Sequence, residues 1–130
     1  MVLPITLTIA AVAALLNIWL ALRVVRLRMT RKVLLGDGGE RALEARIRAH
    51  ANYIEYTPFV LILIGLIEAA HGWPLGLWGV GALYVAARVA HAFGMDATRP
   101  HAARAFGATV TWLTLLGLAG WAIAIVYRAA

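Results

Sequence analysis

Four long apolar stretches constrain the fold of this chain more than any other feature. They lie at about residues 3–22, 51–70, 74–94 and 105–127. Each has about 20 residues, the length that an α-helix needs to cross the hydrocarbon core of a bilayer. Together they use about 80 residues of a 130-residue chain, which leaves no room for a soluble domain. The sequence predicts one all-α domain, an integral membrane bundle of four spanning helices.

The composition agrees with a membrane protein and excludes several classes of site. Hydrophobic residues make up 63% of the chain and charged residues 14%, whereas soluble domains average about 45–50% and about 25%. Cysteine is absent, so disulfides, cysteine nucleophiles and cysteine-bound metal centres are excluded. The sequence has no nucleotide-binding loop, HExxH motif or serine-triad pattern, and its four histidines stand ten or more residues apart. We therefore expect no metal site.

The positions of the basic residues indicate a membrane topology. The formal net charge is +6, and eight of the twelve Lys and Arg residues fall between residues 23 and 48, between the first two apolar stretches. A basic segment placed this way is typical of a cytoplasmic loop and not of a nucleic-acid partner. The third connection adds Arg99 and Arg104, whereas residues 71–74 have no Lys or Arg. We expect cytoplasmic basic loops, outward termini and, from the Ala/Arg-rich composition, a bacterial inner membrane.

A narrow polar stripe lies on the second predicted span. At about 100° per residue, Arg48, Asn52 and Glu55 share one face, with Tyr56 on its flank. Ionisable groups in a span are costly, and they are functional hypotheses by default. The stripe is either a polar ligand site or a structural ion pair between two helices, with Asn52 hydrogen-bonded across their interface. The spacing alone favours neither interpretation.

Three further residues in the first two spans have structural expectations. Pro58 cannot donate a backbone hydrogen bond, so it should kink or loosen the second helix beside Glu55. Glu68 lies close to the outer end of its span, where we expect it to reach water. Asn17 is expected to form an interhelical hydrogen bond and not to bind a ligand.

A second stripe lies on the third span, where Tyr84, Arg88 and His91 share one face. A lone histidine would be interpreted as a satisfied buried residue, but a neighbouring arginine favours a polar site. Because a buried guanidinium needs an acidic partner, Glu55 is the expected partner of Arg88. Arg104, at the entrance of the fourth span, is equally consistent with a topology signal and with a ligand contact.

Residues 48–58, Arg-Ala-His-Ala-Asn-Tyr-Ile-Glu-Tyr-Thr-Pro, resemble the second-helix signature of the MAPEG family, the membrane-associated proteins in eicosanoid and glutathione metabolism. The family pattern is Arg-x-x-x-Asn-x-x-Glu-Tyr-x-Pro, and the sequence matches every fixed position. Residues 26–28 and 87–91 resemble their counterparts in prostaglandin synthase members. Chain length, four spans and a basic first loop also agree, so the resemblance covers nearly the whole chain.

The resemblance implies a homotrimer that binds glutathione, as co-substrate, between neighbouring subunits near the cytoplasmic face. It implies that Arg104 lies near the thiol and is catalytic. The residues that it places in contact with glutathione are Arg26, Arg28, Arg48, Asn52, Glu55, Tyr56, Arg88 and His91.

The chemistry of glutathione is consistent with these residues. Arginine forks suit its two carboxylates, and a glutamate suits its ammonium group. A neighbouring guanidinium lowers a thiol pKa from about 8.5 and increases the thiolate fraction. Met95 and Ala105 stand where some relatives have tyrosine and serine, so thiol activation would depend on Arg104 alone.

The sequence therefore predicts a membrane-bound glutathione transferase or peroxidase that acts on a lipophilic small molecule, in the manner of a detoxification enzyme. The alternative is a non-catalytic family member that binds membrane lipid or serves as a scaffold, which the residues at 95 and 105 motivate. A small multidrug exporter is less favoured, because such transporters usually carry an acid in the first span, where this chain has Asn17.

Overall fold

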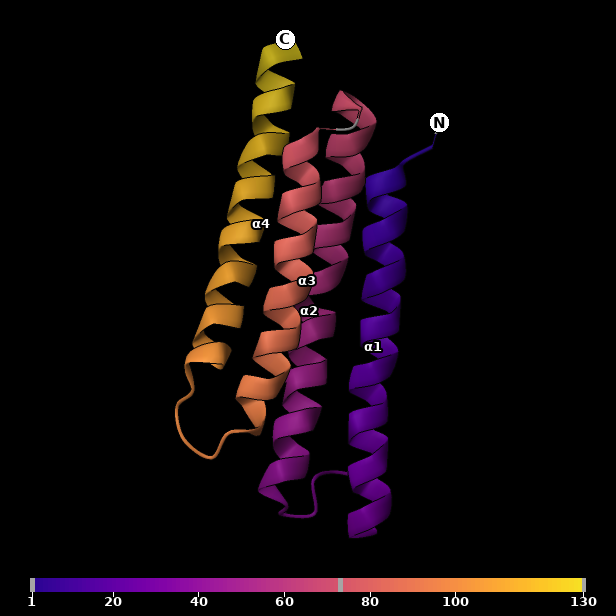
Figure 1. Ribbon diagram of the computed structural model, residues 1–130, viewed down its shortest axis with the longest axis vertical. Helices are drawn as coiled ribbons and strands as arrows, with labels where there is room; N and C mark the ends of the chain where they lie inside the picture. Colours follow the sequence, from indigo (N-terminus) through magenta and orange to yellow (C-terminus); the bar gives the residue numbers. More distant parts are fainter. Residues whose placement is uncertain (1, 73, 130) are drawn as a thin grey trace.

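The computed structural model describes residues 2–72 and 74–129, and it is a bundle of four antiparallel α-helices (Figure 1). The helices are α1 (Pro4–Arg31), α2 (Arg41–His71), α3 (Leu75–Asp96) and α4 (Ala102–Ala129). No β-strand occurs in these described ranges. All four helices are long and apolar enough to cross a membrane. The predicted all-α, four-span architecture is confirmed.

The two ends of the bundle differ in what they contain. The chain ends and the α2–α3 connection lie together at one end, which we call the termini end (Figure 1). The α1–α2 and α3–α4 loops lie at the opposite end, which we call the basic end. Helices α2 and α3 occupy the middle of the bundle, with α1 on one side and α4 on the other. Residues from all four helices therefore meet around α2 and α3.

At the basic end, α1 and α2 extend beyond the apolar stretches that predicted them. Helix α1 continues to Arg31 and stops at Lys32, which adopts a left-handed φ of 56°. Arg28 donates hydrogen bonds to three carbonyls of the following loop, the shortest to Gly36 at 2.8 Å. These bonds satisfy carbonyl groups of the loop that follows α1, so Arg28 stabilises the loop.

Glu68 is buried at the termini end, so the expectation that it reaches water is wrong. Its side chain accepts hydrogen bonds from the backbone N–H groups of Ile5, at 2.9 Å, and Thr6, at 2.7 Å, and from the Thr6 hydroxyl at 2.6 Å. The first N–H groups of a helix have no intrahelical acceptor, and Leu3 provides no side-chain cap. Glu68 of α2 therefore caps α1, surrounded by the apolar core.

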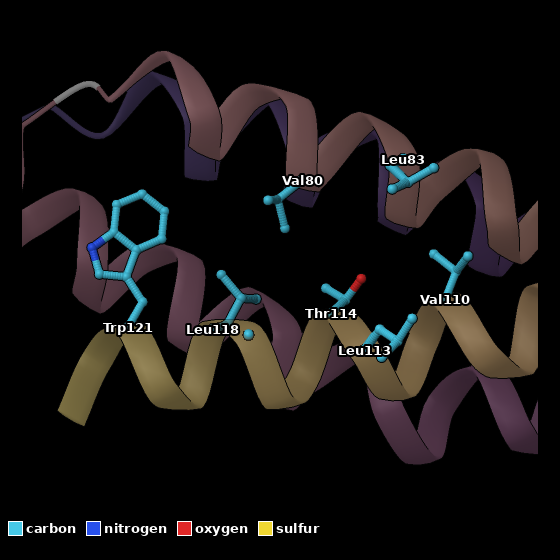
Figure 2. A pocket seen from close by; sticks show the side chains of 8 residues that line it. Val80, Leu83, Val110, Leu113, Thr114, Leu118 and Trp121 are labelled. Atoms are coloured by element: carbon cyan, nitrogen blue, oxygen red, sulfur yellow. The ribbon is translucent and has the colours of Figure 1, made fainter. Parts of the chain in front are cut away.

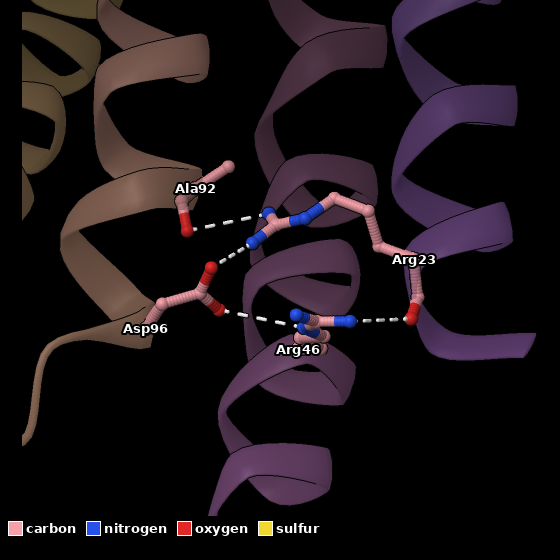
Figure 3. A network of polar contacts seen from close by, with 4 residues as sticks. All are labelled: Arg23, Arg46, Ala92 and Asp96. Atoms are coloured by element: carbon pink, nitrogen blue, oxygen red, sulfur yellow. Dashed lines mark hydrogen bonds and ion pairs between the residues drawn. The ribbon is translucent and has the colours of Figure 1, made fainter. Parts of the chain in front are cut away.

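An ion-pair network joins α1, α2 and α3 at the basic end (Figure 3). Arg23 forms an ion pair with Asp96 and donates to the Ala92 carbonyl at 3.3 Å. Arg46 lies 3.6 Å from the same carboxylate and donates to the Arg23 carbonyl at 3.1 Å. The guanidinium of Arg23 also lies 4.8 Å from the Trp19 ring centroid, close enough for a cation–π interaction. The Asp96 carboxylate thus joins three helices, α1, α2 and α3.

Two glycines allow close packing of α3 against α4. A Cβ atom at Gly107 would collide with His91 and lie 2.7 Å from the Ala87 carbonyl oxygen. A Cβ atom at Gly94 would lie 2.8 Å from the Arg104 Cα. Small residues of this kind let helix backbones approach in a membrane. The start of α4 is therefore held against the end of α3.

Asn17 forms the interhelical hydrogen bond that the sequence predicts. Its Oδ1 lies 2.9 Å from Nε2 of His50, which joins α1 to α2. Helix α2 remains a single helix through Pro58, which lines a groove of about 300 Å³ between these two helices.

Candidate functional site

A buried arginine lies where α2, α3 and α4 meet. Arg88 is 2% exposed. It donates to Asn52 Oδ1 at 2.9 Å through Nη2 and to Thr111 Oγ1 at 3.2 Å through Nη1. Its guanidinium carbon lies 5.7 Å from the Tyr53 ring centroid, and its buried Nε has no hydrogen-bond partner in the described chain. A buried cation held by neutral groups is a strong candidate for anion binding.

The expected ion pair between Arg88 and Glu55 is not observed, and that prediction is wrong for the single chain. None of the ion pairs among the described residues includes either side chain. The buried face of α2 passes through Ala49 and Tyr53. Because Glu55 follows Tyr53 by two residues, it lies about 200° around the helix and is exposed.

The rest of the α2 stripe faces away from the core of its own chain. Arg48 and Glu55 are exposed, while Asn52 and Tyr56 are half-buried. Within residues 2–72 and 74–129, neither Arg48 nor Glu55 forms an ion pair, so an ion pair that joins two helices of this chain does not account for the stripe. Tyr56 accepts a hydrogen bond from Trp112 of α4 at 3.3 Å. The two charged ends of the stripe are accessible, and its middle residue is held by Arg88.

The α3 stripe faces the interior, as its spacing predicts. Tyr84, Arg88 and His91 are each at most 5% exposed, and the Tyr84 hydroxyl lies 2.7 Å from that of Thr57. Nδ1 of His91 is buried and has no partner in the part of the chain that the structure describes. Buried polar atoms are nearly always hydrogen-bonded, so His91 does not fit the interpretation of a satisfied core histidine.

Arg104 lies in a cavity of about 400 Å³ at the basic end, which Arg41, Arg99 and His101 also line. Nδ1 of His101 accepts the backbone N–H of Ala103 at 3.1 Å, so its proton is on Nε2 and can be donated. None of the described residues that line this cavity is Asp or Glu. Three guanidinium groups and an imidazole donor suit an anionic group.

The first-helix arginines are not joined to the α2 stripe within one chain. Arg26 is exposed, and Arg28 is committed to loop carbonyls. Among the described residues, no hydrogen bond or ion pair links either of them to the stripe. A shared site would need a second copy of the chain.

An apolar groove of about 320 Å³ runs between α3 and α4 toward the termini end (Figure 2). The amino-acid sequence did not predict this groove, because Gly, Leu and Val residues at lipid-facing positions are found on any membrane helix and do not define the shape of a pocket. The groove is open to the side of the bundle and suits an apolar chain. Its lining residues are Val80, Leu83, Val110, Leu113, Thr114, Gly117, Leu118 and Trp121.

Sequence reasoning also missed Thr111 and Arg41 as site residues. Thr111 resembles the other threonines of its apolar helix, and only the fold reveals its contact with Arg88. Arg41 could have been found, because it precedes Arg48 by two helical turns and so shares the face of the stripe.

These features define a four-helix membrane protein with a charged stripe on its second helix and buried arginine and histidine on its third. The sequence profile of the MAPEG family matches residues 6–124. The chain therefore belongs to the MAPEG family.

Two curated relatives are similar over most of their length. Both carry the name inner membrane protein YecN, one from Escherichia coli strain K12 and one from Escherichia coli O6:H1 strain CFT073. Each is 36% identical to this chain over 109 residues, which is 82% of this chain and 81% of the relative.

Proposed function

We propose that this protein is a membrane-bound glutathione-dependent enzyme, a transferase or peroxidase that activates the glutathione thiol for attack on a lipophilic electrophile. The observation that carries the proposal is the α2 stripe. Its charged members, Arg48 and Glu55, form no ion pair within the described chain, while Arg88 holds Asn52 between them. Charged groups in a spanning helix need a partner or water, and glutathione offers groups of both signs.

Each residue of the site has a proposed task. Glu55 binds the ammonium group of glutathione, and Arg48 and Asn52 bind a carboxylate, with Tyr56 beside them. Arg88 and His91 supply buried positive charge and a ring nitrogen behind the stripe. The cationic cavity that contains Arg104 lies at the start of α4 and stabilises the thiolate.

The chemistry follows from the thiolate. With a carbon electrophile, the sulfur forms a C–S bond and the leaving group departs with its electron pair. With a lipid hydroperoxide, the sulfur attacks the peroxide oxygen and the O–O bond breaks. The alcohol leaves after gaining a proton, and a second glutathione converts the resulting sulfenic acid to a disulfide and water.

The proposal includes a homotrimer in a bacterial inner membrane, with the basic end in the cytoplasm. The exposed stripe and the exposed Arg26 support a site shared between copies, because neither meets the other within one chain. The relatives named inner membrane protein support the location, and the concentration of Lys and Arg at the basic end supports the orientation.

A second candidate function is lipid binding without catalysis. The apolar groove between α3 and α4 favours it, as does the absence of a hydroxyl at Met95 and Ala105. Such a protein would present a membrane lipid to a partner and would not lower the pKa of a thiol.

The test is the ultraviolet absorbance of the glutathione thiolate, followed against pH in detergent-solubilised protein. We expect the wild-type protein to lower the thiol pKa below its usual value of about 8.5, and Arg104→Ala to raise it again because the guanidinium is lost. Arg128→Ala, at the termini end, is the matched control and should leave the thiol pKa at the wild-type value. Turnover is measured with chlorodinitrobenzene and with a lipid hydroperoxide.

An unshifted thiol pKa together with no turnover would contradict the enzymatic proposal and favour the lipid-binding one. A lowered thiol pKa that Arg104→Ala leaves unchanged would instead remove Arg104 from the thiolate site.

A further inference from the structure

We infer that Thr111 of α4 is a positioning residue of the proposed glutathione site, which acts through Arg88 to orient Asn52. The inference rests on the proposed function, because Asn52 belongs to that site. Thr111 is 1% exposed and lies between Thr109 and Thr114 in a part of α4 without charged residues. Its hydroxyl is the only α4 group that donates to or accepts from Arg88 among the described residues.

The direction of the Thr111 hydrogen bonds is fixed. Its Oγ1 donates to the Gly107 carbonyl at 2.7 Å, and a hydroxyl has a single hydrogen. Toward Arg88, which has only donors, Thr111 therefore acts as an acceptor, at 3.2 Å from Nη1. The hydroxyl cannot rotate away from Arg88 without losing one of its two bonds.

The orientation of the Asn52 side-chain amide is fixed by Arg88. Because a guanidinium only donates, the atom of Asn52 that lies 2.9 Å from Arg88 Nη2 is its oxygen. The NH₂ group then occupies the other branch of the amide and is available as a donor. A donor on the stripe between Arg48 and Glu55 suits a carboxylate of the ligand, whereas a flipped amide would present an oxygen and repel it.

Thr111 also influences the partner that Arg88 takes. Arg88 has no carboxylate partner among the described residues, and Glu55 is an acid on the helix that Arg88 already contacts through Asn52. Loss of the Thr111 acceptor would leave Nη1 buried without a partner, which is costly. The guanidinium of Arg88 would then regain a hydrogen-bond partner by turning toward the carboxylate of Glu55. That movement would release Asn52 and would neutralise the carboxylate that the ligand ammonium needs.

Thr114 provides a matched control. It lies one turn further along α4 and is also buried, at 8% exposed. Among the described residues, the side-chain hydrogen bonds of Arg88 go to Thr111 and Asn52 and not to Thr114. Thr114→Val therefore removes a buried hydroxyl from the same helix without removing a hydrogen bond of Arg88 or Asn52. Thr111→Ser retains the hydroxyl that accepts the hydrogen bond from Arg88.

The experiment uses ¹⁵N-asparagine labelling, because the chain has two asparagines, Asn17 and Asn52. Their side-chain NH₂ signals are recorded for the full-length protein in detergent, with and without glutathione. We expect Thr111→Val to move the Asn52 signals and leave those of Asn17 unchanged. Thr111→Ser and Thr114→Val should leave both pairs close to their wild-type positions.

The same four proteins are titrated with glutathione. We expect Thr111→Val to weaken binding roughly tenfold, the size of one hydrogen bond to a charged group, and the other two variants to bind within about twofold of wild type. Unmoved Asn52 signals in Thr111→Val would overturn the inference, whether or not glutathione binds. Moved signals with unchanged glutathione affinity would overturn it too.

Wild-type protein that binds no glutathione would overturn the proposed function, and with it the assignment of Thr111 to a glutathione site. The Asn52 signals would still decide whether Thr111 controls the Arg88–Asn52 pair.

Discussion

Helix α2 contains two glutamates in membrane-spanning sequence, and their surroundings are opposite. Glu68, at the termini end, is 1% exposed and accepts three hydrogen bonds from the start of α1. Glu55, toward the basic end, is exposed and forms no ion pair within the described residues. Both carboxylates are costly to place in a membrane, but among the described residues only Glu68 has partners that offset this cost.

The difference separates a structural carboxylate from a functional candidate. Glu68 completes the hydrogen bonding of a helix N-terminus, so its cost is offset during folding. Glu55 forms no ion pair with any residue that the structure describes, and Arg48 and Asn52, on the same face of α2, carry hydrogen-bond donors. An exposed carboxylate without an ion-pair partner among the described residues is available to an external partner.

The largest loss of stability should follow from Glu68→Ala. The variant leaves the N–H groups of Ile5 and Thr6 without their acceptor, which we expect to lower the free energy of unfolding by about 2–4 kcal/mol. The free energy of unfolding is measured in detergent, with the loss of helix followed by circular dichroism. Glu68→Gln retains one acceptor oxygen and should lose less. Equal, small losses for both variants would show that Glu68 is not the cap of α1.

A smaller loss is expected from Gly107→Ala at the basic end. The added Cβ would collide with His91 and with the Ala87 carbonyl, and overpacking of this kind costs about 1–3 kcal/mol. Gly117→Ala, ten residues further along α4, meets nothing within 4 Å and is the control. Because Ala is the better helix former, Gly117→Ala should be neutral or slightly stabilising. Equal thermal midpoints for the two variants would contradict the close α3–α4 packing.

The smallest effect on stability is expected from Glu55→Ala. Its carboxylate has no ion-pair partner to lose, so the free energy of unfolding should change by no more than about 0.5 kcal/mol. The same unfolding measurement applies. A decrease in the free energy of unfolding as large as that of Glu68→Ala would show that Glu55 has a structural partner. The contrast between the two glutamates would then be lost.

The architecture was predictable because membrane-spanning helices have a simple signature. Four apolar stretches of the required length predict the bundle. The stripe formed by Tyr84, Arg88 and His91 correctly identifies the interior face of α3. The ends of the helices were less predictable. Helix α1 continues nine residues past its apolar stretch to Arg31, because a helix that leaves the bilayer still satisfies its own backbone hydrogen bonds.

The partners of the polar residues were the least predictable part. Glu55 and Glu68 are the same residue type on the same helix, and only the position of α1 makes one of them a cap. Arg88 was expected to need an acid, but Asn52 and Thr111 occupy its two Nη groups instead. The ion pair between Arg23 and Asp96 joins residues 73 positions apart, which no local pattern encodes.

The most direct measurement of the central claim is the titration of glutathione into wild-type protein and into Glu55→Ala, with Gly117→Ala as a control of matched stability. Thiolate absorbance and binding heat are recorded together. The account predicts saturable binding and a thiolate signal in the wild-type and control proteins, and the loss of both in a Glu55→Ala variant that remains folded. Equal binding by Glu55→Ala and the wild type would contradict it.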